Sequence, residues 1–262
     1  MKKKIRSHVQ MPRGVLSEFE DASKHLYCYD VTRKRIITSN SKDINVEKGY
    51  YSAEWDHFMG RKIESPFFEI VHEVKCLDFD AVVNPVPKNF REAILSFLYA
   101  LIVRDPLMFR TVSLYERLVP LLISLQQRHD LTTMVGLQEA SKKKLFDDYI
   151  ITVLKNETEI PFILSTKGIY EWGEYIIFPI TPKLAIILLP MDKDVCQEWI
   201  QDGKIPLLIT EDKDEIMSMN ITAFISQVKR GTGYIVSNYK ELIVYIRDYI
   251  FTFYGEALCF LE

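Results

Sequence analysis

The sequence predicts an α+β protein, and two observations support this prediction. Short runs rich in aromatic and β-branched residues lie near the start of the chain and again past residue 159. Between them, apolar residues recur with helical spacing over long stretches. Segregated strands and helices of this kind are typical of the α+β class. We expect a single domain over residues 1–262, with a helical core at about 52–155 and a β-rich C-terminal part at about 159–262.

The N-terminal region predicts a β-hairpin followed by helix. The runs 26–31 and 35–38 flank a short polar link and suit two paired strands. Ser52 can cap the next helix, and acidic residues occupy the first turn, where the helix dipole favours them. Pro66 marks a break or a second helix start, after which apolar residues continue at helical spacing to Leu77.

The middle of the chain predicts a central helical block over 88–155. Its first helix, 88–104, is apolar on most of its surface and should be the most buried. Pro106 ends this helix, because a proline excludes the preceding residue from the helical region. Two further helices are expected at 106–129 and 132–154.

The C-terminal part predicts a small sheet with flanking helices. Turn signals separate its short apolar runs, and helical spacing resumes twice before the end. We expect strands at 161–165, 175–180, 184–189 and 233–237, and helices at 216–229 and from about 242 onward.

Composition excludes several classes of protein. The chain has 262 residues, 48% of them hydrophobic, so it can bury a core and is not a disordered tail protein. With 33 Lys and Arg against 36 Asp and Glu, the net charge of -3 gives no global field for nucleic acid or anionic membrane. A nucleic-acid partner would therefore need a local patch.

Hydropathy and cysteine spacing indicate a cytoplasmic protein. The longest apolar run, 184–190, is far shorter than the roughly 20 residues of a membrane helix, so no membrane partner is expected. The four cysteines show no Cys-x-x-Cys pair, and we expect reduced, buried thiols: Cys28, Cys76, Cys196 and Cys259.

Several short motifs occur in an order and spacing that resemble a known group. They are Pro12, Leu16 and Phe19, then Tyr51-Ser52, Arg104-Asp105-Pro106, Pro161-Phe162-Ile163, Phe178-Pro179-Ile180-Thr181-Pro182, Asn220 and Tyr234-Ile235-Val236-Ser237. The chain is similar to an uncharacterised bacterial group, the domain-of-unknown-function family 4238. It departs from that pattern at His8, four residues before Pro12 instead of three, and at Ser165-Thr166, where Ser-Asp is usual. If the missing Asp is catalytic in relatives, this chain has lost that activity.

His8, Arg13, Glu64 and Arg104 form the candidate catalytic group. An imidazole titrates near neutral pH and can act as a general base, and arginine binds phosphate. Together they favour a nuclease-like or phosphoryl-handling enzyme of a defence or mobile-element system, for which a divalent cation such as Mg²⁺ is a possible cofactor. In the alternative interpretation, His8 and Arg13 tie down the N-terminal segment and Arg104 satisfies carbonyls at a helix end.

Other candidate sites are weaker. Ser165 and Asn220 are candidate substrate-binding residues, although the turn at Lys167-Gly168 explains the first segment equally well. Two Glu-x-x-His sequences, ending at His57 and His72, have the spacing of di-iron ligands. On one straight helix they would lie about 22 Å apart, too far to share a metal, so only a sharp reversal of the chain near Pro66 would allow a metal-dependent oxidation site. A non-enzymatic protein-binding or regulatory module remains the alternative function.

Overall fold

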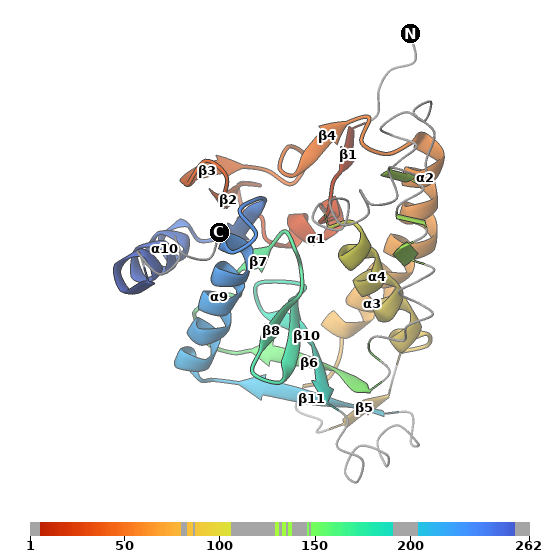
Figure 1. Ribbon diagram of the computed structural model, residues 1–262. Helices are drawn as coiled ribbons and strands as arrows, with labels where there is room; N and C mark the ends of the chain where they lie inside the picture. The colour runs from red at the N-terminus through yellow and green to blue at the C-terminus, as the bar shows by residue number, and fades with distance from the viewer. Residues whose placement is uncertain are drawn as a thin grey trace.

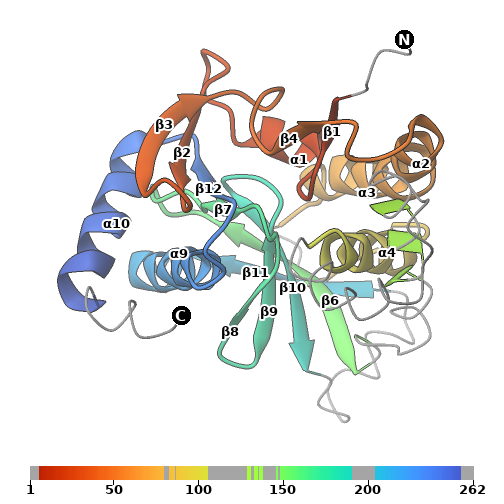
Figure 2. The same ribbon diagram turned by 45° about the horizontal axis from the view of Figure 1, so that its top comes forward.

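The computed structural model describes most of the chain. The described residues are 6–79, 83–85, 87–105, 129–130, 133–134, 136–137, 146, 148–190 and 204–254. They form an α+β arrangement in which helices lie on both sides of a group of sheets (Figures 1 and 2). This confirms the predicted fold class.

A six-stranded mixed sheet lies at the centre of the molecule. Its order is β5 (Val83–Pro85), β11 (Lys204–Thr210), β6 (Tyr149–Asn156), β10 (Leu184–Pro190), β9 (Tyr175–Pro179) and β8 (Tyr170–Trp172). All neighbours pair antiparallel except β11 and β6, which are parallel. The central strands β6 and β10 are almost wholly buried, as their near-continuous apolar sequences require.

A four-stranded sheet joins the two ends of the chain. Its order is β3 (Arg35–Ser39), β2 (Leu26–Asp30), β12 (Tyr234–Ser237) and β7 (Leu164–Ser165). The predicted N-terminal hairpin therefore exists, and its strand β2 pairs antiparallel with β12. A separate two-stranded sheet is formed by β1 (Arg6–His8) and β4 (Val46–Lys48).

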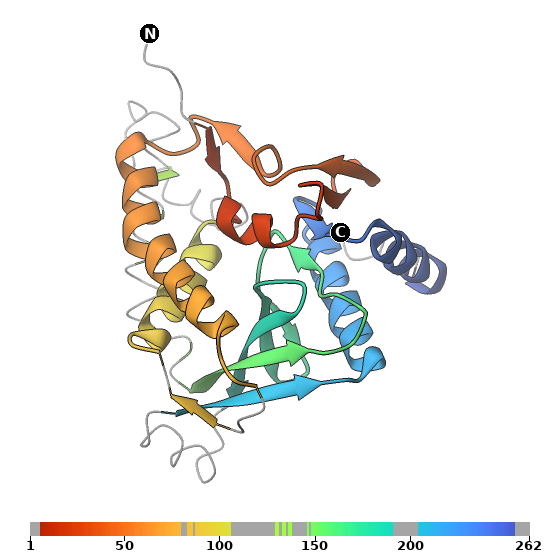
Figure 3. The ribbon, with the colours of Figure 1, turned by 180° about the vertical axis from the view of Figure 1, so that it is seen from behind.

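The helices divide between two sides of the sheets (Figures 2 and 3). On one side lie α2 (Ala53–Met59), a π-helical turn at Gly60–Glu64, α3 (Ser65–Lys75) and α4 (Phe90–Val103). On the other lie α9 (Lys213–Val228) and α10 (Lys240–Tyr254), while the short α1 (Arg13–Glu18) follows β1.

Stacked aromatic rings join α3, α4 and the central sheet. The Phe67 and Phe97 rings stack with centroids 3.7 Å apart, and the Phe97 centroid lies 5.8 Å from that of Phe178 on β9. The apolar residues Met11, Leu16 and Phe19 complete this core from the N-terminal segment. The segment after residue 6 therefore folds back onto the body, as its apolar content indicates.

The predicted helical block is wrong at its C-terminal end. Residues 149–154, expected to be helical, belong to β6, and β5 also falls within the expected helical core. The run Ile150-Ile151-Thr152-Val153 is β-branched throughout, and pairing with β10 and β11 outweighs the weak helical spacing. The described parts of 129–137 are helical, whereas the expected helix at 106–129 otherwise lies outside the described residues.

Some of the remaining sequence predictions are confirmed and others are wrong. The strands and helices predicted past residue 159 are present, although the strand expected at 161–165 covers only β7, and β8 and β11 were not predicted. Cys28 is free and buried as expected, whereas Cys76 is free but exposed, because it follows the last turn of α3. Cys196 and Cys259 lie outside the described residues. Among those described, no helix has both the length and the apolar character needed to cross a bilayer.

Leu98 tests the predicted burial of α4. Its side chain is completely buried, so Leu98→Ala leaves a cavity and should lower the free energy of unfolding by about 2–5 kcal/mol. Chemical denaturation measures this change. Ile209→Ala, on a side chain that is 45% exposed, is the control and should cost less than half as much. A loss below about 1 kcal/mol for Leu98→Ala would contradict a central position of α4.

Candidate active site

His8 lies at the end of β1, where pairing with β4 fixes the backbone opposite Val46. Its ring Nε2 is 2.8 Å from the carbonyl oxygen of Ser41. Because a carbonyl only accepts, we infer that Nε2 carries the proton and that Nδ1 of the neutral ring is the basic nitrogen. Within the described part of the chain, Nδ1 forms no hydrogen bond.

Three charged side chains act on the His8 imidazole. Burial is the largest effect and lowers the pKa of His8 below its usual value, with a further lowering by the Arg104 guanidinium. The carboxylates of Glu64 and Asp56 act in the opposite direction and favour the imidazolium. The structure thus gathers three of the four predicted catalytic residues, His8, Glu64 and Arg104, and adds Asp56.

Arg104 and Glu64 form a buried ion pair across two helices. Arg104 follows the last residue of α4, and its Nη1 donates to Glu64 Oε1 at 2.8 Å. The Arg104 side chain is only 4% exposed, and its Nε has no hydrogen-bond partner among the described residues. The guanidinium is therefore used in a side-chain pair, which differs from the predicted alternative of capping carbonyls at the helix end.

The π-helical turn determines where Glu64 lies. Glu64 is its last residue, and the Gly60 carbonyl accepts from both the Ser65 backbone N–H and, at 2.9 Å, the Ser65 Oγ. π-Helical turns within α-helices occur frequently at functional positions because they rotate the following side chains relative to a regular helix. Here the turn separates α2, which carries Asp56, from α3.

Aromatic side chains pack beside the ion pair. The Arg104 guanidinium carbon lies 5.6 Å from the centroid of the Tyr51 ring, a cation–π contact. The Tyr51 hydroxyl donates to the Val9 carbonyl at 3.3 Å, and burial raises the pKa of Tyr51 to about 12. Tyr51 is therefore a neutral donor at neutral pH.

A segment far along the chain completes this region. The His129 ring stacks on Tyr50 with centroids 3.9 Å apart, and its Nδ1 lies 2.9 Å from the Tyr50 carbonyl. Asp130 accepts from the Ser52 backbone at 3.1 Å. Sequence analysis missed these residues because no local pattern links them to His8. The only available signal was Tyr51-Ser52, which is a motif of the resemblance.

The other predicted site residues lie elsewhere. Arg13 is the exposed first residue of α1, and the structure gives it no place in the His8 group. Asn220 on α9 accepts from the Ile163 amide at 2.9 Å and donates to the Pro161 carbonyl at 2.8 Å. Ser165 is fully buried in β7 and pairs through its backbone with β12. Asn220 thus ties α9 to the segment before β7, whereas the buried Ser165 Oγ has no hydrogen-bond partner among the described residues.

The structure shows no converging metal ligands. Among the described residues, no three His, Cys, Asp or Glu side chains are placed to share an ion. The two Glu-x-x-His sequences lie on α2 and α3, and the helical backbone continues through Gly60 and Ser65 between them. No chain reversal at Pro66 brings them together.

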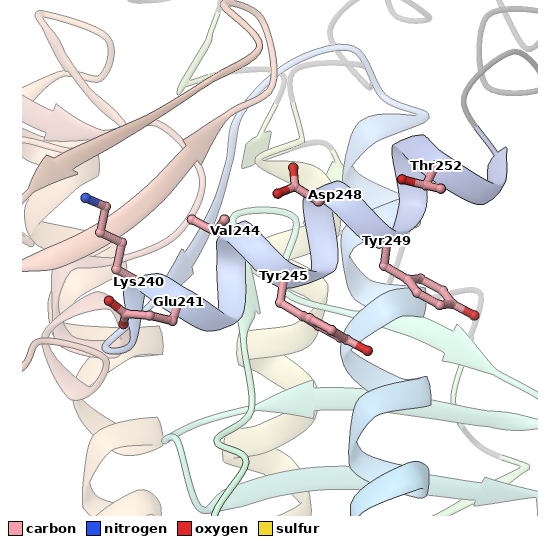
Figure 4. A pocket seen from close by; sticks show the side chains of 7 residues that line it. All are labelled: Lys240, Glu241, Val244, Tyr245, Asp248, Tyr249 and Thr252. Carbon is pink, nitrogen blue, oxygen red and sulfur yellow. The ribbon is translucent and has the colours of Figure 1, made fainter.

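The face of α10 is a second surface feature. Figure 4 shows a shallow depression lined only by side chains of this helix, with Tyr245 and Tyr249 on one side of it. It lies across the molecule from β1 and α2, as Figure 2 shows, and is separate from the His8 group.

No protein-family model, no curated protein and no solved structure matches the chain.

Burial of His8 predicts a pH dependence of stability. The folded protein holds the neutral imidazole and has a pKa below 6.5, so the unfolded chain binds more protons as the pH falls through 6.5. The contribution of His8 to stability is therefore complete above pH 6.5 and decreases below it. Urea denaturation between pH 5 and 7.5 measures this slope, and His8→Asn should flatten it.

The matched control is His72→Asn, on an exposed position of α3. This variant should keep the pH slope of the unmutated protein. An unchanged slope in His8→Asn would contradict the burial of a neutral imidazole at residue 8.

Proposed function

We propose that this protein is a hydrolase of phosphodiesters, nuclease-like in its chemistry, with His8 as the general base. The observation that carries the proposal is the hydrogen bonding of the His8 ring, from which its tautomer is inferred. The Ser41 carbonyl holds Nε2 while Nδ1 is left without a hydrogen bond among the described residues. A lowered pKa keeps this nitrogen unprotonated at neutral pH, as a general base requires.

The surrounding charges support the same chemistry. In the proposed reaction Nδ1 takes a proton from water as its oxygen forms a bond to phosphorus. The ester P–O bond breaks, and the imidazolium returns the proton to the departing oxygen. Glu64 and Asp56 stabilise the imidazolium that forms in between, since both carboxylates favour the charged ring. Arg104, held by Glu64, supplies the positive charge on which a phosphate oxygen can be placed.

A second candidate function belongs to another class. Tyr245, Tyr249 and Phe253 form a row of neighbouring rings along α10, stacked for the first pair and tilted for the second, with centroids 6.3 Å and 4.8 Å apart. Tyr245 and Phe253 are 55% and 69% exposed. Exposed aromatic residues are enriched in protein interfaces, so this surface favours a protein-binding or regulatory module. The defence or mobile-element setting stays a prediction from sequence.

Replacing His8 tests the enzyme. We expect the unmutated protein to cleave single-stranded RNA or DNA, assayed with and without Mg²⁺ or Mn²⁺, and His8→Ala to lose at least about 100-fold in rate, the usual contribution of a general base. The melting temperature of the variant should stay within a few degrees, the scale of about 1 kcal/mol for a chain of this size.

His72→Ala, on the exposed side of α3, is the control and should keep full activity. Unmutated protein that hydrolyses neither nucleic acid nor nucleotide under all these conditions would overturn the proposal. So would a His8→Ala variant that retains the unmutated rate.

A further inference from the structure

Four buried N–H donors near His8 have no hydrogen-bond partner in the described part of the chain. They are Gln10 Nε2, Asn45 Nδ2, Trp55 Nε1 and Arg104 Nε. Buried donors are almost always paired in folded proteins, so each unpaired donor calls for an explanation. Four of them in one region suggest a missing acceptor.

Contacts place all four residues around the same two side chains, Val9 and Tyr51. Gln10 follows Val9 in the chain, and the Val9 amide donates to the Asn45 carbonyl at 2.9 Å. Trp55 packs against the small apolar cluster of Val9, Tyr50 and Tyr51. Arg104 lies over the Tyr51 ring, whose hydroxyl donates to the Val9 carbonyl. The four residues thus belong to four chain segments that meet around Val9 and Tyr51.

The chemistry of the group selects its ligand. These four are N–H donors, and the buried Ser7 hydroxyl beside His8, which also has no partner among the described residues, can donate as well, so the ligand must present several acceptor oxygens. Among the described residues, the region holds the Arg104 guanidinium against the carboxylates of Glu64, Asp56 and Asp130, with His8 neutral. That excess of negative charge opposes a dianion more strongly than a monoanion. A phosphodiester presents several acceptor oxygens and carries one negative charge, so it suits both the donors and the charge of the region. A phosphomonoester presents the oxygens but is a dianion.

The β1–β4 sheet provides a way in for this ligand. The four N–H groups have almost no exposed surface, so part of the structure must move before a ligand reaches them. β1 and β4 are three residues each and pair with no other sheet among the described residues. An isolated two-stranded sheet is only marginally stable. Gln10 and Asn45 lie beside its ends, whereas Trp55 and Arg104 belong to the helices.

We propose that these donors bind a phosphodiester group of a single-stranded nucleic acid between the β1–β4 sheet and the helices α2 and α4. This inference rests on the proposed function and names its substrate class. The β1–β4 sheet opens to admit the strand, and the four N–H groups then donate to the phosphate and its ester oxygens. His8, at the end of β1, comes to the same phosphate as the sheet closes.

Trp55→Phe is the main test, because it removes the indole N–H and keeps an aromatic ring beside Phe58. Binding of a fluorescently labelled ten-nucleotide DNA is measured by anisotropy in the His8→Ala background, so that cleavage does not interfere. Loss of one such donor should raise the Kd about tenfold. Asn45→Asp is a second variant of equal size that replaces a donor by an acceptor, and it should weaken binding further.

The control is Trp172→Phe, because the Trp172 indole already donates to Ser218 Oγ at 3.1 Å. It should leave the Kd within about twofold. Competition then tests the charge argument: the dinucleotide TpT should displace the labelled DNA at lower concentration than thymidine monophosphate.

Two sets of outcomes separate this inference from the proposed function. The inference is overturned if the labelled DNA does not bind, if neither Trp55→Phe nor Asn45→Asp weakens binding of folded protein, or if the monophosphate competes better than TpT. Cleavage by unmutated protein together with any of these results leaves the proposed function standing. Donor-dependent binding without cleavage removes the hydrolase and supports the binding site.

Discussion

The ion pair between Arg104 and Glu64 is the interaction on which the arrangement around His8 depends. It ties the end of α4 to the π-helical turn between α2 and α3. A buried guanidinium without a counter-charge is strongly unfavourable, so the fold must bring Glu64 to this position. The π-helical turn is the local irregularity that does so, and the same turn sets the orientation of α2 and Asp56. The pair thereby fixes the charges that His8 meets.

Burial and charge then give His8 its properties. Burial holds the ring neutral, and the Ser41 carbonyl selects the tautomer. The two carboxylates offset part of the cost of protonation, so the ring can accept a proton during a reaction without being charged at rest. The buried donors of residues around Val9 and Tyr51 have no hydrogen-bond partner in the described part of the chain. A proton acceptor, a cation and unused donors occur in one region, which is the combination that phosphodiester hydrolysis needs.

The elements with strong local patterns were predictable from the sequence. The prediction failed where pairing between distant segments determines the secondary structure. The hairpin β2–β3, the Ser52 cap and the buried α4 all follow from local residue order, and the Ser52 hydroxyl does accept from the Trp55 amide. β6 was predicted as helix because its apolar content fits both periods over a short run. Only its pairing with β10 and β11 selects the strand.

The candidate site, too, could be predicted from the sequence only in part. His8, Glu64 and Arg104 were predicted from their chemistry, and the structure brings them together, while Arg13 lies apart from them. Asp56 was explained by a favourable interaction with the helix dipole, because no local pattern indicated that α2 lies near β1. His129 and Asp130 reach Tyr50 and Ser52 from almost 80 residues away, a contact that no single-sequence pattern indicates. Asn220 is a polar residue whose two hydrogen bonds to the backbone could not be foreseen.

A double-mutant cycle on Arg104 and Glu64 tests the central claim most directly. The free energy of unfolding is measured for Arg104→Met, Glu64→Met and the double variant. Each single change should cost about 2–4 kcal/mol, with the larger loss for Glu64→Met, which leaves the guanidinium buried and unpaired. The double variant should cost at least about 1 kcal/mol less than the sum of the two. Additive losses would show that the pair is not coupled and would contradict its place as the interaction that organises the site.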